Sequence, residues 1–403
     1  MPSVLFVDDE PRVLDGLRNA LRKWRRKWDM DFVPGPEEGL RQLARRPYDV
    51  IVTDMRMPGM DGASFLEEAR RRHGDTVRVV LSGYAESEAA MRAVSVAHQF
   101  VMKPCAPEVL VDVIARAIAL EQLVNDEELR KAIASMDQLP SVPKVYSDLT
   151  VALADVNTDA RTVAKIVEQD PGMSAKVLQL VNSAFFASPS PMTDVSQAVM
   201  RLGFDCVRDL ALTLEVFRPG TMRGVGPSVL ERIQRHAMFT GGVVRSMAAQ
   251  LDKRTAEQAA LAAMLHDVGR LVLMSAKGKD YAALEQGAVD DAELVEAERA
   301  SWGTSHAEAG AYLLGLWGLP YPVVEAVARH HQPERAPATA QLPWMVHVAC
   351  RVAELVEGHR DATADDCREV FGPLVAEHPE RAPMVAHAWR AAQALLDKSE
   401  RTS

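Results

Sequence analysis

Cysteine is scarce in this sequence, and positive charge is not in excess. Only 4 cysteines occur in 403 residues, and no two of Cys105, Cys206, Cys350 and Cys367 form a CxxC pair. This pattern supports neither a disulfide framework nor a thiolate zinc site, so we expect reduced thiols. The formal net charge of −10 leaves no broad basic surface for phosphate contacts. A DNA-binding regulator is therefore disfavoured, and no helix-turn-helix with a basic recognition helix is apparent.

The first residues lack the features of a targeting or anchoring segment. MPSVLFVDDE contains no basic cluster, and its apolar run ends at Asp8. Neither a signal peptide nor a membrane anchor is predicted there. Apolar residues make up 48% and charged residues 25% of the chain, which is typical of a soluble globular protein. We expect a cytoplasmic protein without membrane association.

The length predicts two or three domains, and the first 120 residues have an alternating pattern. Short β-rich runs alternate there with helical stretches, which we place at 13–28, 36–46, 64–73 and 86–96, followed by a last helix. The β-rich runs are VLFV, DFV, VIVT, VRVVL and QFVM. Such alternation predicts a doubly wound, flavodoxin-like sheet of five parallel strands with helices on both faces. The last helix is expected to continue into NDEELRKA as a connecting helix and a seam for a homodimer.

After Pro140 and Pro143 the strand pattern stops, and amphipathic helices follow, among them 144–153, 160–169 and 173–182. The second half is therefore predicted to be all-α. The break HQPERAPATAQLP after His331 predicts a separate final pair of helices that ends near Leu396. The expected domains are the α/β domain at 1–120, a helical linker at 121–136, a helical domain at 137–335 and a helical extension at 336–403.

Polar residues follow several of the predicted strands. Asp8 and Asp9 follow the first strand and Asp54 the third. Because the carboxyl ends of parallel strands share one sheet edge, these carboxylates would meet there and repel one another. Mg²⁺ suits such a cluster of oxygen ligands. The sequence therefore predicts a magnesium site at this edge.

Ser82 and Lys103 end the fourth and fifth strands, which places a hydroxyl donor and an ammonium beside the same carboxylates. This set suits in-line transfer of a phosphoryl group to the Asp54 carboxylate. The alternative is that the aspartates only cap the following helices, as aspartate often does. The recurrence of polar residues at several strand ends favours the phosphoryl site.

The motifs FVDDE, IVTDMRMPGMDG, LSGY and FVMKP, in this order, resemble the receiver family of two-component response regulators over the first 120 residues. The resemblance implies phosphorylation by a histidine kinase in a phosphorelay, and a Lys–Pro bond that is often cis. It implies that Asp54 is the phosphoacceptor, that Asp8 and Asp9 are the Mg²⁺ carboxylates, and that Met55, beside this metal site, donates its backbone amide to the phosphoryl group. It also implies that Ser82 is the switch hydroxyl, that Lys103 contacts the phosphate and that Phe100 is the rotating aromatic.

The tracts LPSVPKVYSDL, IVEQDPGMSAKVLQLVNSAFF and AVMRLGFDCVRDLAL resemble the HDOD domain, a helical relative of the HD phosphohydrolases, over residues 137–335. The resemblance implies an output domain controlled by the receiver. Our leading interpretation is a non-catalytic output that acts through an unidentified protein partner, because charge added at Asp54 can shift domain packing.

A set of histidines and one aspartate in this half is the candidate site for a transition metal, because imidazoles and a carboxylate that face one another across a bundle bind such ions. The set is His236, His266, Asp267, His306, His330 and His331. HD hydrolases use a similar set to attack a phosphate ester with metal-bound hydroxide.

Three features of the sequence depart from those hydrolases. Cys350 stands where their late aspartate ligand is expected, Arg270 replaces their usual lysine, and HHQPER lacks the GYP signature of related phosphodiesterases. We therefore interpret the histidines as a vestigial site or as buried hydrogen-bonding residues. The alternative function is a phosphorylation-gated, metal-dependent phosphohydrolase or phosphodiesterase.

Overall fold

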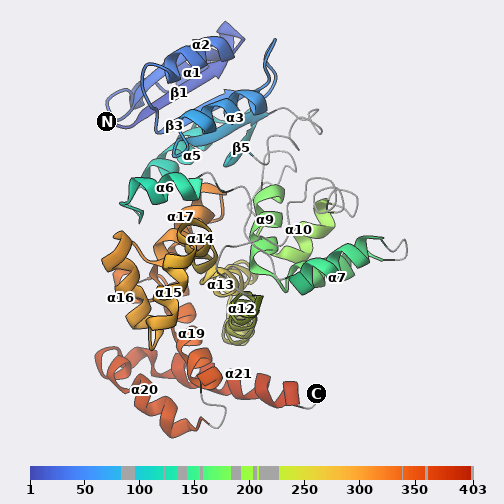
Figure 1. The fold of residues 1–403 in the computed structure, drawn as a ribbon, viewed down its shortest axis with the longest axis vertical. Helices are drawn as coiled ribbons and strands as arrows, with labels where there is room; N and C mark the ends of the chain where they lie inside the picture. The colour runs from blue at the N-terminus through green and yellow to red at the C-terminus, as the bar shows by residue number, and fades with distance from the viewer. Residues whose placement is uncertain are drawn as a thin grey trace.

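The computed structural model describes residues 1–82, 96–120, 123–134, 136, 143–154, 158–182, 192–202, 207, 227–337, 339–358 and 362–400. Within them an α/β domain precedes a helical remainder, and the two lie against each other (Figure 1). The helix predicted over 86–96 lies outside the described residues apart from its last residue. Cys206 and the boundary predicted at 137 also lie outside them.

The α/β domain contains five parallel strands in the order β2-β1-β3-β4-β5, which confirms the predicted sheet. The strands are β1 (Ser3–Asp8), β2 (Asp29–Pro34), β3 (Val50–Asp54), β4 (Val77–Ser82) and β5 (Gln99–Met102). Every residue of β3 and β4 is buried. Near-continuous apolar runs of this kind are typical of strands covered on both faces.

The described helices of this domain are α1 (Pro11–Ala20), α2 (Pro36–Leu43), α3 (Gly62–Arg72) and α5 (Pro107–Leu120). Proline opens α1 and α2, and the Asp61 side chain accepts a hydrogen bond from the Ser64 amide at the start of α3. The first helix is shorter than predicted, because the chain continues as a 3₁₀ turn, η1 (Arg22–Trp24).

The predicted continuous connecting helix is wrong. Helix α5 ends at Leu120, and a new helix, α6 (Glu127–Ala134), begins after a break. The Asp126 carboxylate accepts a hydrogen bond of 2.8 Å from the Leu129 amide, so it caps a new helix start. The apolar face of α5, which includes Leu110, Ile114 and Ala117, is buried against the rest of the molecule.

The remaining described elements are helical, which confirms the predicted all-α second half. They are α7 (Pro143–Ala154), α8 (Ala160–Val167), α9 (Pro171–Val181), α10 (Val195–Leu202), α12 (Pro227–Met247), η5 (Ala248–Gln250), α13 (Lys253–Leu265), α14 (Val268–Lys277), α15 (Lys279–Gly287), α16 (Asp291–Trp302), α17 (His306–Leu316), α18 (Tyr321–Arg329), η6 (Pro333–Arg335), α19 (Leu342–Gly358), α20 (Ala364–Glu377), η7 (Pro379–Arg381) and α21 (Ala382–Glu400). Asp170 caps α9 through the Met173 amide, at the helix boundary that Asp-Pro predicts.

Helix α19 packs against α12, α13 and α18, and Val346, Val348 and Val352 are fully buried. The predicted boundary between 335 and 336 therefore does not separate two packing units. The end of the chain also contains three helices, α19, α20 and α21, instead of the predicted pair. Helix α21 returns to α12, where the Leu395 side chain fills the space beside Gly242.

One stretch among the described residues, Lys253–Lys277, has the length and apolar composition of a membrane span. It comprises α13, the turn at His266 and Asp267, and α14, and most of it is buried inside the helical domain. Burial of this kind is typical of core helices in soluble proteins, and such a stretch is weak evidence for a span.

Candidate functional site

The structure brings Asp8, Asp54 and Lys103 together at the carboxyl edge of the sheet. The Lys103 ammonium donates to Asp8 Oδ2 at 2.8 Å and also to Asp54 Oδ1. Asp8 is 1% and Asp54 9% exposed, so the two carboxylates share one counter-ion in a partly enclosed site. Asp9 follows directly and is half-buried. The Lys103–Pro104 bond is cis.

Burial and the contact between the carboxylates and the Lys103 ammonium determine the pKa values at this edge of the sheet. Burial raises the pKa of Asp54 and the charge of Asp8 adds to this, whereas hydrogen bonding to Lys103 opposes it. Burial would lower the pKa of Lys103, but its bonds to the two carboxylates prevail and raise it. Oxygen donors with incomplete charge compensation fit a hard divalent cation, so Asp8, Asp9 and Asp54 suit Mg²⁺.

The other residues predicted for this site lie around the carboxylates. Ser82 is buried at the end of β4, and its carbonyl oxygen accepts the Lys103 amide at 2.8 Å. This backbone bond joins Ser82 and Lys103 at neighbouring strand ends. Phe100 lies within β5 and is 9% exposed, with its ring in the core.

The predicted use of the Met55 amide is corrected by the structure. This amide donates to the Leu81 carbonyl oxygen at 3.0 Å as part of the sheet, so it does not face the carboxylate. The Arg56 amide donates instead to Asp54 Oδ2 at 2.8 Å. Gly62 lies behind this loop, where a Cβ atom would stand 2.2 Å from the Asp54 carbonyl oxygen. Only glycine fits there without moving the loop that follows Asp54.

A second cluster lies in the helical domain, where the predicted histidines meet. His266 and Asp267 occupy the turn between α13 and α14, His306 begins α17, and His330 and His331 end α18. Asp267 Oδ1 lies 3.4 Å from His306 Nε2, 3.7 Å from His266 Nε2 and 3.8 Å from His330 Nε2. His331 Nε2 lies 2.9 Å from His306 Nε2. One donor atom from each of Asp267, His306, His330 and His331 lies within 4.8 Å of the others.

One further predicted residue and one cysteine form a second group with His266. His236, from α12, and Cys350, from α19, join it, and their donor atoms again lie within 4.8 Å of one another. Cys350 Sγ is 3.6 Å from His236 Nε2. The six predicted residues thus lie in two neighbouring groups, and the thiol that stands in place of the expected aspartate belongs to the second group.

The outer nitrogens of these histidines have partners that turn the inner nitrogens towards the centre. Nδ1 of His266 lies 2.7 Å from the Ala263 carbonyl oxygen, and Nδ1 of His330 lies 2.7 Å from the Val327 carbonyl oxygen. A carbonyl only accepts, so each Nδ1 carries the proton and each Nε2 presents a lone pair. For the other two histidines the partner of Nδ1 is a carboxylate. Nδ1 of His236 lies 2.8 Å from a Glu357 oxygen, and Nδ1 of His306 lies 2.8 Å from a Glu298 oxygen. Such outer partners are typical of metal-binding histidines.

Several inner atoms have no hydrogen-bond partner within the part of the chain that the structure describes. They are Nε2 of His266, Nε2 of His330 and Oδ1 of Asp267, all buried. A buried polar atom without a partner costs about 1 to 3 kcal/mol, and three that converge fit a bound cation. By this test the residues present suit a transition metal.

Three of the imidazoles suit a cation because they are uncharged. Burial would lower the pKa of His306, but the carboxylates of Glu298 and Asp267 raise it to about 10, so His306 is itself a cation in the metal-free protein. Burial lowers the pKa of His266 to about 4, and it lowers the pKa of His330 and His331 further below the ordinary value. These imidazoles are neutral near pH 7. Burial would raise the pKa of Asp267, but the charge of Arg270 outweighs it and holds Asp267 as a carboxylate.

Two glycines allow the helices that carry the cluster to touch. A Cβ atom on Gly269 in α14 would stand 1.7 Å from the His306 carbonyl oxygen, and one on Gly310 in α17 would stand 2.8 Å from the Gly269 nitrogen. Because the two helices touch here, His306 at the start of α17 lies close to Asp267. Sequence reasoning singled out neither glycine.

Sequence reasoning also missed the carboxylates behind the histidines. Glu298, in α16, is 0% exposed and accepts hydrogen bonds from His306 and from the Tyr281 hydroxyl. One signal was available, because Glu298 follows Leu294 and Val295 on the buried face of its helix. An acidic residue in the apolar stripe of a helix indicates a buried partner.

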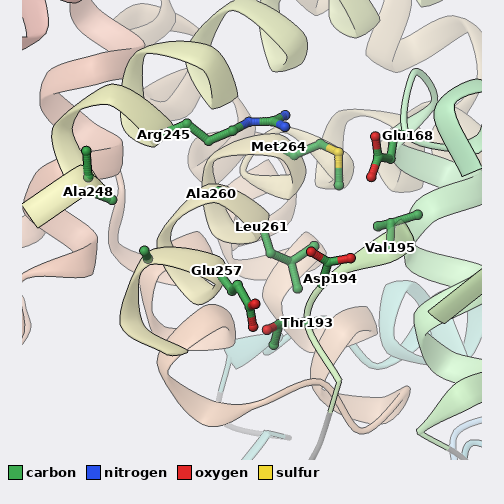
Figure 2. A pocket seen from close by; sticks show the side chains of 12 residues that line it. Glu168, Thr193, Asp194, Val195, Arg245, Ala248, Glu257, Ala260, Leu261 and Met264 are labelled. Carbon is green, nitrogen blue, oxygen red and sulfur yellow. The ribbon is translucent and has the colours of Figure 1, made fainter. Parts of the chain in front are cut away.

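The histidine cluster is enclosed, because His266 and His306 are 0%, His330 1% and His236 7% exposed. A separate pocket of about 240 Å³ opens between α12 and α13 on one side and residues 193–195 with Glu168 on the other. Figure 2 shows Arg245 and Met264 in the upper part of the view, and Glu257 of α13 close to Thr193 in the lower part. Glu168 already accepts a bond of 2.8 Å from Ser196. The pocket walls do not include the predicted histidines.

The two domains meet at α17. The Gln99 side chain, at the start of β5, donates to the Gly315 carbonyl oxygen at 3.1 Å, and Leu120 of α5 packs on Gly315. At the other end of α17, the Thr304 hydroxyl donates to the Leu123 carbonyl oxygen at 3.2 Å. Helices α5 and α6 both contact α17, which lies directly below α6 in the view of Figure 1.

Comparisons with known proteins divide the chain in the same way. Residues 4–115 match the response regulator receiver domain, and residues 139–333 match the HDOD domain. Over 126 residues the chain is 38% identical to the hydrogenase transcriptional regulatory protein HoxA of Cupriavidus necator, across 31% of this chain and 26% of HoxA. An uncharacterized protein of Treponema pallidum is 27% identical over 244 residues, across 56% of this chain and 44% of that protein.

The chain thus spans about a quarter of HoxA and less than half of the Treponema protein. Among solved structures, the MmoQ response regulator of Methylococcus capsulatus is 21% identical, with a TM-score of 0.48, and the match covers 62% of this chain and 98% of MmoQ.

Proposed function

Since this chain belongs to the response regulators, with a receiver domain followed by an HDOD domain, we propose that phosphorylation of Asp54 changes how these domains pack and thereby controls the binding of a protein partner. A receiver domain implies a histidine kinase as the source of the phosphoryl group. The observation that carries the proposal is the position of β5, which has Lys103 beyond one end and Gln99 at the other.

The chemistry at Asp54 follows from its neighbours. Mg²⁺, held by Asp8, Asp9 and Asp54, would supply charge neutralisation for the incoming phosphoryl group. An Asp54 carboxylate oxygen forms the new bond to phosphorus, and the donor departs with the electrons of the old bond. The Lys103 ammonium, already in contact with this carboxylate, moves to a phosphoryl oxygen, and the Ser82 hydroxyl donates to another.

This change can reach the HDOD domain through a short path. Lys103 is four positions beyond Gln99 in the chain, or about 13 Å along the strand. If Lys103 shifts towards the phosphoryl group, the position of β5 changes at both ends, and with it the contact of Gln99 with Gly315. Helix α17 then carries the change from the receiver to the histidine cluster.

Two observations support partner binding as the output. The histidine cluster is enclosed, so a phosphate ester could reach it only after helices move. Its seventh member is a thiol where a carboxylate ligand is expected in HD hydrolases. Absence of DNA contacts, a homodimer and a cytoplasmic location remain predictions, which gel shift, sedimentation and cell fractionation test.

Hydrogen–deuterium exchange on the full chain tests the proposed switch. We expect phosphoramidate with Mg²⁺ to add one phosphoryl group and to change exchange in residues 99–102 and 304–316. Asp54→Asn should show neither effect, and Asp15→Asn, an exposed aspartate on α1, should behave as the unaltered protein. If the protein is phosphorylated but the exchange rates of residues 99–102 and 304–316 stay the same, the proposal is contradicted.

A second candidate function is a phosphorylation-gated phosphohydrolase. The convergence of unpaired donor atoms in the histidine cluster favours it, because catalytic metal sites are built from such sets. Hydrolysis of bis-p-nitrophenyl phosphate and of cyclic dinucleotides by metal-loaded protein, with and without phosphoramidate, tests it. Turnover that disappears in His266→Ala would establish catalysis, and no turnover in either phosphorylation state would exclude it for these substrates.

A further inference from the structure

The segment that follows the HDOD match contributes to the histidine cluster. Helix α19 begins at Leu342, beyond residue 333 where the match ends. It carries Cys350, which is 2% exposed and points at the cluster with its sulfur 3.6 Å from His236 Nε2. The same helix carries Glu357, the partner of His236 Nδ1.

We propose that Cys350 is a metal ligand, and that Cys350, His236 and His266 form a sulfur-containing site for a zinc-like transition metal. This site lies beside the group of Asp267, His306, His330 and His331, which offers only nitrogen and oxygen. The proposal rests on the metal binding that also underlies the second candidate function, but it requires no catalysis.

The separation of the donor atoms supports this assignment. Zinc bonds of about 2.3 Å to sulfur and about 2.0 to 2.1 Å to nitrogen, at tetrahedral angles, place neighbouring donors about 3.5 Å apart. The Cys350 sulfur and His236 Nε2 are 3.6 Å apart. All three donors lie within 4.8 Å of one another, so small side-chain rotations bring the set to bonding distance.

The partners of the imidazoles are consistent with ligation. His266 Nε2 is buried and has no hydrogen-bond partner among the described residues, while its Nδ1 is fixed by the Ala263 carbonyl oxygen. The Glu357 carboxylate holds Nδ1 of His236 in the same way, so that Nε2 of this ring faces the cluster. Both rings therefore present a lone pair towards the sulfur side of the cluster.

The alternative role for Cys350 is that of a buried thiol that donates to Glu354, whose Oε1 lies 3.2 Å from the sulfur. When the thiol binds a divalent metal, the S–H bond breaks, sulfur keeps the electron pair for the metal, and the proton is released to water. The two roles differ in whether a sulfur–metal bond forms.

Sulfur changes which metal the cluster selects. Thiolate ligands favour zinc and other borderline or soft ions, whereas carboxylate and water suit magnesium and manganese. A Cys350→Asp variant restores the carboxylate that HD hydrolases have at this place. It should therefore keep a metal site but lose the preference for zinc.

Cobalt absorption spectroscopy on the full chain tests the sulfur–metal bond. After removal of metal with a chelator, we expect Co²⁺ to produce a thiolate-to-cobalt charge-transfer band in the near ultraviolet, which rises to a plateau at one equivalent and is displaced by Zn²⁺. Cys350→Ser and Cys350→Asp should bind Co²⁺ without this band. Zinc affinity of the site in Cys350→Ser should fall at least about 100-fold, since even outer partners contribute 10- to 100-fold.

Controls separate this thiol from the others and from folding. A variant with Cys105, Cys206 and Cys367 replaced by serine should keep the band, and circular dichroism should show unchanged helix content in each variant. Bound Co²⁺ without a band, or a band that persists in Cys350→Ser, would overturn the proposal. No bound metal would overturn both this proposal and the hydrolase, whereas a band without turnover would refute the hydrolase alone.

Discussion

The side-chain amide of Gln99 donates a hydrogen bond to the main-chain carbonyl oxygen of Gly315, with the two atoms 3.1 Å apart and 216 positions between them in the chain. Gln99 begins the strand that leads to Lys103, and Gly315 lies in the last turn of α17, whose first residue is His306. Eleven residues of helix span about 16 Å. One rigid helix therefore has the receiver at one end and the histidine cluster at the other.

We predict that Gly315→Ala weakens the contact between the domains. Its Cβ atom would stand 2.4 Å from Leu120 Cδ2, so Leu120 must move and α5 must shift from α17. Overpacking of this kind costs about 1 to 3 kcal/mol. Hydrogen exchange should become faster in α5 and α17. Gly372→Ala, in α20 with no atom within 4 Å, is the control and should be neutral or stabilising.

We predict that Lys103→Met destabilises the receiver and makes it more responsive to Mg²⁺. Removal of the ammonium leaves two buried carboxylates without their shared counter-ion, at a cost of about 1 to 3 kcal/mol. Mg²⁺ should then raise the melting temperature of the variant more than that of the unaltered protein, because binding to the folded state stabilises it. Lys131→Met, at an exposed pair with Glu127, should change neither quantity. The prediction is contradicted if Mg²⁺ raises the melting temperature equally in the unaltered protein, Lys103→Met and Lys131→Met.

We predict that Gly269→Ala disrupts the histidine cluster. The new methyl group would overlap the His306 carbonyl oxygen, which is backbone and cannot move without α17. We expect a loss of at least about 3 kcal/mol in the free energy of unfolding, measured by urea denaturation, together with loss of bound metal. Gly287→Ala, with no atom within 4 Å, is the matched control. A stable Gly269→Ala protein with unchanged metal content would show that this helix contact is dispensable.

We predict that the metal-free protein loses stability as the pH rises from 6.5 towards 10, and that Glu298→Gln reduces this loss. Burial would lower the pKa of His306, but the Glu298 carboxylate and the nearby Asp267 raise it to about 10, while Arg270 opposes them. A raised folded-state pKa stabilises the protein fully below the unfolded value, and this stabilisation disappears through the folded value.

The limiting slope from one such group is about 1.4 kcal/mol per pH unit. Urea denaturation of chelator-treated protein at several pH values measures it. His330 and His331 also face His306, but their pKa values lie well below 6.5, so they contribute little to this range. If the free energy of unfolding falls with pH at the same rate in Glu298→Gln and in the unaltered protein, Glu298 is not the cause of the raised His306 pKa.

Sequence periodicity predicted the sheet and the separate helices because each strand is covered on both faces and each helix has an apolar stripe. The connection after Leu120 was predicted incorrectly, since the apolar pattern continues across the break and only the Asp126 cap interrupts it. The membership of the histidine cluster was predictable from residue type. The partition of its donor atoms into two groups was not, because it depends on the helix approach at Gly269 and on outer partners such as Glu298.

Helix α19 has a practical consequence for how this chain is divided. A fragment ending at residue 333 would contain every residue of the HDOD match but would lack Cys350 and Glu357. The inner faces of α12, α13 and α18 would lose the helix that covers them, and His236 would lose its orienting carboxylate. Such a fragment would be expected to aggregate and to bind metal weakly, and would lead an experimenter to conclude that the domain is inert. The unit recognisable by similarity and the unit that builds the cluster end at different residues.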